Sequence, residues 1–131
     1  MSERPPSIHI DDLADPQFAP HIVEMMQAVV AHFDRAPDLL VNSAALFGQD
    51  RLEDVSESDL MRHYAVNCAT PVLLTQAFVK ASDKSGRTRS IVNILDQRVW
   101  RPGPDFFSYT LSKSALWSAT RMLAQALAPR I

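Results

Sequence analysis

Apolar and polar residues follow two different periods along this chain, and each period predicts a type of element. Helical spacing of apolar residues predicts amphipathic helices over residues 20–34, 57–81 and 106–128. Two shorter stretches, 38–42 and 90–95, are almost continuously apolar, a pattern typical of parallel strands that are buried on both faces. The order helix, strand, helix, strand, helix therefore predicts an α/β fold with a parallel sheet.

The N-terminal part carries weaker signals. Residues 7–11 alternate β-branched and polar side chains and predict a short strand, while Asp15 followed by Pro16 forms a helix-start signal. Residues 1–6 are polar and rich in proline, and we expect them to be disordered. A chain of 131 residues suits a single domain, so we treat 1–131 as one.

Pro71 lies inside the predicted helix over 57–81. A proline has no N–H to donate to the carbonyl of the residue four positions earlier, and its ring pushes that carbonyl aside. That residue is Asn67, so the sequence predicts a kinked helix with the main-chain carbonyl of Asn67 free. A purely structural kink is the alternative interpretation.

Polar or small residues follow both predicted strands. Asn42, Ser43 and Ala44 come at the end of the first strand, and Asp96 follows the second. The carboxyl ends of parallel strands meet at one edge of the sheet, which is where such folds bind ligands. A plain strand-to-loop exit would give the same pattern.

Tyr109 and Lys113 lie one turn apart in the predicted helix over 106–128. Residues at positions i and i+4 share a helix face, so the two side chains are expected side by side. A nearby cation favours the phenolate, which would lower the pKa of Tyr109 and make it a better proton donor near neutral pH. A surface tyrosine and lysine on one helix face is the alternative.

Composition excludes several classes of function. The net charge of −2 gives no basic field for nucleic acid, and we interpret the basic stretch 84–89 as a solvated turn. A single cysteine, Cys68, excludes an internal disulfide framework and a multi-cysteine zinc site. No apolar run approaches the ~20 residues of a membrane span, and the N-terminus has no signal core. We therefore expect a cytoplasmic protein without a membrane partner, and we assign no metal site.

The chain resembles the short-chain dehydrogenases/reductases. Five features carry the resemblance, in the family's order: Asp12-Leu13, the strand and turn 39–45, Asn67 in the kinked helix, the strand 91–94, and the Tyr-x-x-x-Lys pair of Tyr109 and Lys113. Two positions of the turn depart mildly from the family's Asn-Asn-Ala-Gly, since Ser43 and Ala45 replace its second Asn and its Gly. The resemblance implies a Rossmann-like doubly wound parallel sheet and NAD(P)-dependent oxidoreductase activity.

The resemblance also implies a role for each candidate catalytic residue. Tyr109 would donate a proton, Lys113 would lower its pKa and hold the nicotinamide ribose, and Asn67 would hold a relay water through its carbonyl. Asp96 occupies the place of the family's catalytic serine, thirteen residues before Tyr109. An aspartate there resembles the pteridine reductase branch, including dihydromonapterin-type reductases, and implies hydride transfer to a pterin or carbonyl substrate. An ordinary solvated loop aspartate is the alternative.

The resemblance implies a nicotinamide cofactor, with NADP(H) favoured over NAD(H). The positions that correspond to its contacts are Asp12, Leu13, Asn42, Ser43, Ala44, Tyr109 and Lys113. Three aromatic residues, Trp100, Phe106 and Phe107, could stack on a substrate ring, although hydrophobic packing is the favoured explanation for each.

The family's glycine-rich N-terminal βαβ unit and its C-terminal strands have no counterpart in this chain. We therefore expect a partial Rossmann-like fold, an internal fragment that is weak or inactive alone. The alternative function is an inactive fragment that acts by association with itself or with a full-length homologue. The helices over 57–81 and 106–128 would form that contact, since they form the subunit interface in the family, and a homo-oligomer is expected.

Overall fold

The computed structural model describes residue 13 and residues 18–81 and 85–131. Its elements, in chain order, are α1 (Phe18–Phe33), β1 (Leu39–Asn42), α2 (Glu57–Tyr64), the π-helical turn η2 (Ala65–Ala69), α3 (Thr70–Lys80), β2 (Ser90–Asn93), the 3₁₀ turn η3 (Gln97–Val99) and α4 (Phe107–Leu127). The predicted strand 7–11 and the helix-start signal at Asp15 and Pro16 lie outside the described residues. None of the helices in the described part of the chain is long and apolar enough to cross a membrane.

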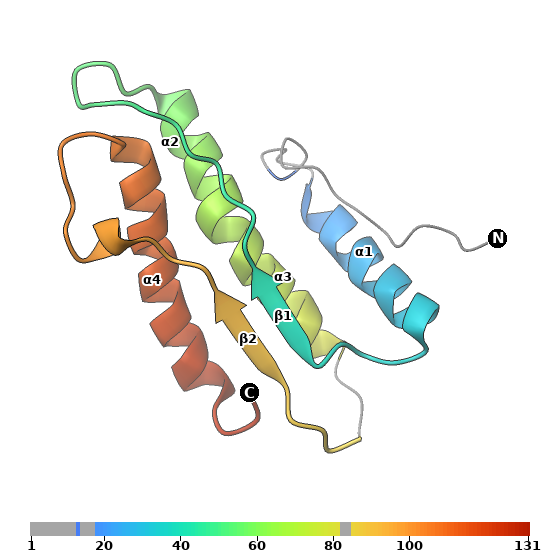
Figure 1. Cartoon of the computed structure of the whole chain (residues 1–131). Helices are drawn as coiled ribbons and strands as arrows, with labels where there is room; N and C mark the ends of the chain where they lie inside the picture. The colour runs from blue at the N-terminus through green and yellow to red at the C-terminus, as the bar shows by residue number, and fades with distance from the viewer. Residues whose placement is uncertain (1–12, 14–17, 82–84) are drawn as a thin grey trace.

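Strands β1 and β2 pair in parallel, from Leu39 opposite Ser90 to Asn42 opposite Asn93. Helix α1 runs on the side of β1 and α4 on the side of β2, with α3 between them (Figure 1). Both strands point toward the end of the molecule where α2 and α4 begin (Figure 1). The predicted α/β fold with a parallel sheet is confirmed.

One face of this sheet is covered and the other is open. Leu40, on the covered face, packs against a core formed by Leu13 and by residues of α1, η2 and α3. The buried members of this core are Leu13, Phe18, Ile22, Met26, Val66, Ala77 and Phe78. On the open face Leu39, Val41, Val92 and Ile94 are each 42–56% exposed. The expectation that both strand faces are buried is therefore wrong for the described residues, because the three long helices that they include all cover the same face.

The predicted long helix over 57–81 is interrupted where Pro71 suggested. Ser56 caps its start, and the N–H of Asp59 donates to the Ser56 hydroxyl over 3.1 Å. The interruption is the π-helical turn η2, after which the N–H of Thr70 bonds to the carbonyl of Ala65, five residues earlier. A wider turn thus accommodates Pro71, which lies in the first turn of α3, where its missing N–H costs little.

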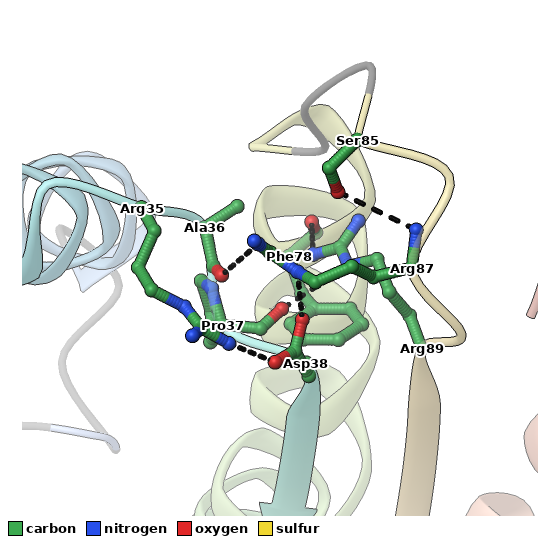
Figure 2. Close-up of polar contacts among 8 residues, drawn as sticks. All are labelled: Arg35, Ala36, Pro37, Asp38, Phe78, Ser85, Arg87 and Arg89. Atoms are coloured by element: carbon green, nitrogen blue, oxygen red, sulfur yellow. Dashed lines mark hydrogen bonds and ion pairs between the residues drawn. The ribbon is translucent and has the colours of Figure 1, made fainter.

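Arginine side chains form hydrogen bonds and ion pairs at the amino ends of both strands (Figure 2). The carboxylate of Asp38 accepts from Arg35 and, over 2.8 Å, from Nε of Arg87. The guanidinium of Arg89 lies 3.8 Å from the ring centroid of Phe78 in α3 and donates to the Phe78 carbonyl over 2.6 Å. Arg87 and Arg89 therefore link the entries of both strands to each other and to α3, while residues 85–88 stay exposed, as the interpretation of a solvated turn expects.

Candidate active site

The carboxyl end of β2 leads directly to Asp96, and the first turn of α4 places Tyr109 against it. The Tyr109 hydroxyl donates to Oδ2 of Asp96 over 2.9 Å. The other oxygen, Oδ1, accepts the N–H of Arg98 over 2.8 Å and so caps η3. That backbone bond, together with the Tyr109 bond and the charges of Arg98 and Lys113, lowers the pKa of Asp96 against the opposing effect of burial. Asp96 is therefore an ionised acceptor near neutral pH and not a free solvated loop residue.

Tyr109 is only 6% exposed, and its pKa is raised to about 12. Burial is the largest cause, followed by the hydrogen bond to Asp96 and the Asp96 charge, while Arg98 acts in the opposite direction. The expectation that Lys113 lowers the pKa of Tyr109 is wrong for this structure, because the Asp96 carboxylate accepts the hydrogen bond of the phenol over 2.9 Å, whereas Nζ of Lys113 bonds to the carbonyl of Ile94. Tyr109 is consequently protonated near neutral pH.

Lys113 shares the Tyr109 face of α4, as its spacing predicts, but its amine is directed elsewhere. Nζ donates to the carbonyl of Ile94 over 2.8 Å and lies 6.0 Å from the Tyr109 ring centroid. Burial lowers the pKa of Lys113, and the Asp96 charge partly offsets this. The lysine is thus anchored at the end of β2, beside the Tyr109–Asp96 pair.

Asn67 acts through its side chain in this structure. Its Oδ1 accepts the N–H of Leu46 over 2.7 Å, and its Nδ2 donates to the Leu46 carbonyl and to the hydroxyl of Ser112, over 2.8 and 2.9 Å. These bonds tie the loop after β1 to α4, next to Lys113. The role expected for the Asn67 carbonyl, holding a relay water, stays a prediction.

The residues after β1 border a small hollow. Asn42, Ser43 and Ala44 line a cavity of about 70 Å³ together with Leu13. Nδ2 of Asn42 donates to Asn93 over 2.7 Å, whereas the buried Oδ1 of Asn42 has no partner in the described part of the chain. Four predicted cofactor positions therefore border one cavity, and one of them, Asn42, has a buried side-chain oxygen without a partner among the described residues. Asp12, the fifth position at this end, lies outside the described residues.

Phe47 is an aromatic residue that the sequence interpretation missed. Its ring is 59% exposed, stacks on Phe106 at 4.5 Å between centroids with an interplanar angle of 6°, and meets Tyr109 edge-on at 4.6 Å. Phe106 adopts a left-handed backbone conformation, with φ 51° and ψ 48°, which costs a bulky residue about 1–3 kcal/mol. The signal available was an aromatic residue two positions beyond the small-residue turn at 43–45. By contrast, Trp100 meets Trp117 edge-on and remains 65% exposed, so packing accounts for only part of its surface.

Comparison with known proteins identifies the family to which this arrangement belongs. The model of the family described as Enoyl-(Acyl carrier protein) reductase matches residues 13–131. The chain belongs to the short-chain dehydrogenase/reductase family. Among curated relatives in that family, human dehydrogenase/reductase SDR family member 4 is 34% identical over 110 residues, which are 82% of this chain and 38% of the relative.

Two solved members of the family are more similar in sequence. FolM alternative dihydrofolate reductase 1 from Brucella canis, complexed with NADP, is 45% identical with a TM-score of 0.78, covering 84% of this chain and 44% of that chain. The corresponding protein from Brucella suis, also in complex with NADP, is 44% identical with a TM-score of 0.81, covering 91% of this chain and 47% of that chain. The chain thus spans less than half the length of these relatives and forms a partial Rossmann-like fold.

Proposed function

We propose that this chain carries the catalytic site of an NAD(P)H-dependent reductase, with a pterin-type C=N bond as the favoured substrate and a carbonyl group as the other candidate. The observation that carries the proposal is the hydrogen bond of 2.9 Å between the Tyr109 hydroxyl and Asp96, at the position where the family has a serine. The similarity to two NADP-complexed FolM proteins supports both the cofactor and the substrate class.

The carboxylate of Asp96 favours a substrate that donates hydrogen bonds. An ionised carboxylate can only accept, whereas a serine hydroxyl could donate to a ketone oxygen. The bond from Arg98 keeps the pKa of Asp96 low, so a carbonyl oxygen would face a negative charge there. The N–H groups of a pterin or folate ring would instead replace the Tyr109 hydroxyl as donors to Asp96. The exposed ring of Phe47, edge-on to Tyr109, offers a flat surface for such a planar ring.

The residues at the end of β1 are the ones that we expect to contact part of the nicotinamide cofactor. Leu13, Asn42, Ser43 and Ala44 line one cavity, and the buried Oδ1 of Asn42 is an acceptor without a partner in the described part of the chain. When bound, the cofactor supplies the hydride that adds to the carbon of the C=N bond. Tyr109 supplies the proton that the nitrogen gains, and Lys113 is the group expected to hold the ribose hydroxyls.

A chimera provides the test, because the chain matches only part of its relatives. Residues 18–131 would replace the corresponding segment of Brucella FolM, and NADPH oxidation would be followed with dihydrofolate. We expect turnover that falls by about 10²–10⁴-fold in Tyr109→Phe, the range for loss of a general acid. Turnover unchanged by Tyr109→Phe would contradict the assignment. The chain alone is expected to show little or no turnover.

Association without catalysis is the second candidate function. Met61 and Tyr64 on α2 and Leu111 and Met122 on α4 are 49–69% exposed, although each is a large apolar or aromatic residue. Exposed apolar residues on adjacent helices are typical of an interaction surface. Light scattering of the isolated chain tests this candidate: a concentration-dependent dimer supports it, and a monomer at all concentrations contradicts it.

A further inference from the structure

The helix that carries Tyr109 does not cap its own N-terminus. The N-cap residue Phe106 provides no side-chain bond and has the left-handed backbone conformation. Asp50, 58 residues earlier than Ser108, supplies the missing acceptors: its Oδ1 accepts the N–H of Ser108 over 3.0 Å, and its Oδ2 accepts the Ser108 hydroxyl. Its main-chain carbonyl also accepts the N–H of Phe107 over 3.3 Å.

Both partners are removed from water. Asp50 is 7% exposed and Ser108 is 1% exposed. A buried carboxylate is costly unless its lone pairs are satisfied, and the positive end of a helix favours it. Burial raises the pKa of Asp50, but the bonds from Ser108 and Phe107 outweigh it, so the net pKa is lowered. The contact is therefore between an ionised carboxylate and the first turn of α4.

The segment that carries Asp50 is itself held at several points. The Leu46 main chain is held by Asn67 through bonds of 2.7 and 2.8 Å, and the N–H of Gly48 donates to Nε2 of His63 over 3.0 Å. A fixed segment can impose a position on the helix that it contacts, which a mobile loop could not do. Asp50 is thus held in one position against the start of α4.

We propose that Asp50 is a positioning residue for Tyr109, an inference that rests on the proposed function above. Ser108 immediately precedes Tyr109, so the Asp50 bonds fix the first turn at the position from which the Tyr109 hydroxyl reaches Asp96 over 2.9 Å. Without them, the first turn of α4 loses its cap, the bond to Asp96 lengthens and water reaches the phenol.

Titration of the phenol tests this directly, because the chain has two tyrosines, Tyr64 and Tyr109. In a Tyr64→Phe background, the ultraviolet absorbance of phenolate reports Tyr109 alone, which should ionise near pH 12. Asp50→Asn should lower this pH by on the order of one unit, since both the burial and the Asp96 bond that raise the pKa are weakened. Circular dichroism at each pH confirms that the signal comes from folded protein.

Two further variants separate a positioning role from a merely structural one. Ser108→Ala removes only the hydroxyl bond and should shift the titration in the same direction, and it replaces Asp50→Asn if that variant does not fold. Asp59→Asn, which removes the carboxylate bonded to Ser56 at the start of α2, is the stability control and should leave the Tyr109 titration unchanged. A lowered melting temperature with an unchanged Tyr109 titration in Asp50→Asn and Ser108→Ala would overturn the proposal, since it would show a merely structural role.

The same variants in the FolM chimera separate this inference from the proposed function. We expect Asp50→Asn to lower kcat more than it raises KM, because the proton donor is displaced while the substrate surface remains. An inactive parent chimera with a shifted titration contradicts the proposed function and leaves the positioning role supported. An active parent chimera with an unshifted titration contradicts the positioning role alone.

Discussion

Replacement of Asp96 by Asn tests the electrostatics of the site most closely. The pKa of Tyr109 is raised to about 12, compared with about 10 for a free phenol. Two units correspond to roughly 3 kcal/mol of preference for the protonated form. Burial is the largest contribution and survives in Asp96→Asn, whereas the acceptor bond and the charge of Asp96 disappear. We therefore expect the pKa to fall by on the order of one unit but to stay above that of a free phenol.

The assay is the phenolate titration in the Tyr64→Phe background, with Asp105→Asn as a matched control. Asp105 is paired with Arg98 over 3.0 Å but makes no bond to Tyr109, so its removal should change the titration much less. The raised pKa also predicts a pH dependence of stability. Tyr109 contributes stability below about pH 10, and this contribution is lost as the pH rises toward about 12. An unchanged or higher Tyr109 pKa in Asp96→Asn would refute this reasoning.

Three further predictions concern the framework of the site. A Cβ at Gly48 would lie 3.0 Å from Cε1 of buried His63, so Gly48→Ala should destabilise the fold by about 1–3 kcal/mol in urea unfolding. If Gly48→Ala destabilised the fold more in the His63→Ala background, this would contradict a clash with the His63 ring. Asn67→Ala leaves both main-chain groups of Leu46 without partners and should cost about 2–4 kcal/mol by the same measurement; a loss below about 0.5 kcal/mol would show that water replaces the bonds. Because the pKa of Asp50 is lowered, its stabilising effect is present above about pH 4 and is lost as the pH falls further. The free energies of unfolding of the parent and of Asp50→Asn should therefore converge in acid. A difference between them that stays constant with pH would contradict an ionised carboxylate.

Local patterns were sufficient to predict the framework of this molecule. The apolar runs place β1 and β2, and the i, i+4 spacing puts Tyr109 and Lys113 on one face of α4. The position of Asp96 after a strand also predicted that it lies at the carboxyl edge of the sheet, where Tyr109 bonds to it. These features depend on residues that are neighbours in the sequence or on the rule that parallel strands end at one edge.

The pKa of Tyr109 could not be predicted in this way. Spacing fixes which side chains share a face, but not the direction of the Lys113 amine, which is set by the carbonyl of Ile94. The dominant neighbour of the phenol is instead Asp96, thirteen residues away in sequence. The pKa therefore depends on which charge lies nearest in the folded chain and on burial, and neither follows from a helical pattern.

Contacts across long sequence separations were missed for the same reason. Asp50 has no helical or strand pattern, and its role appears only when α4 lies against the loop after β1. Phe47 is flanked by ordinary loop residues and becomes notable through its contacts with Phe106 and Tyr109. The uncovered face of the sheet is a further case, since a continuous apolar run such as 38–42 does not show which of its faces the described helices cover.

The substrate preference of Asp96 gives the most direct test of the central claim. In the FolM chimera, kcat/KM would be measured for dihydrofolate and for a simple aromatic ketone, with Asp96 and with Asp96→Ser. We predict that the serine variant loses dihydrofolate reduction by at least about tenfold and gains ketone reduction, because a hydroxyl can donate to a carbonyl oxygen and a carboxylate cannot. An unchanged ratio of the two kcat/KM values would contradict the claim that the Tyr109–Asp96 pair selects a nitrogen-containing ring.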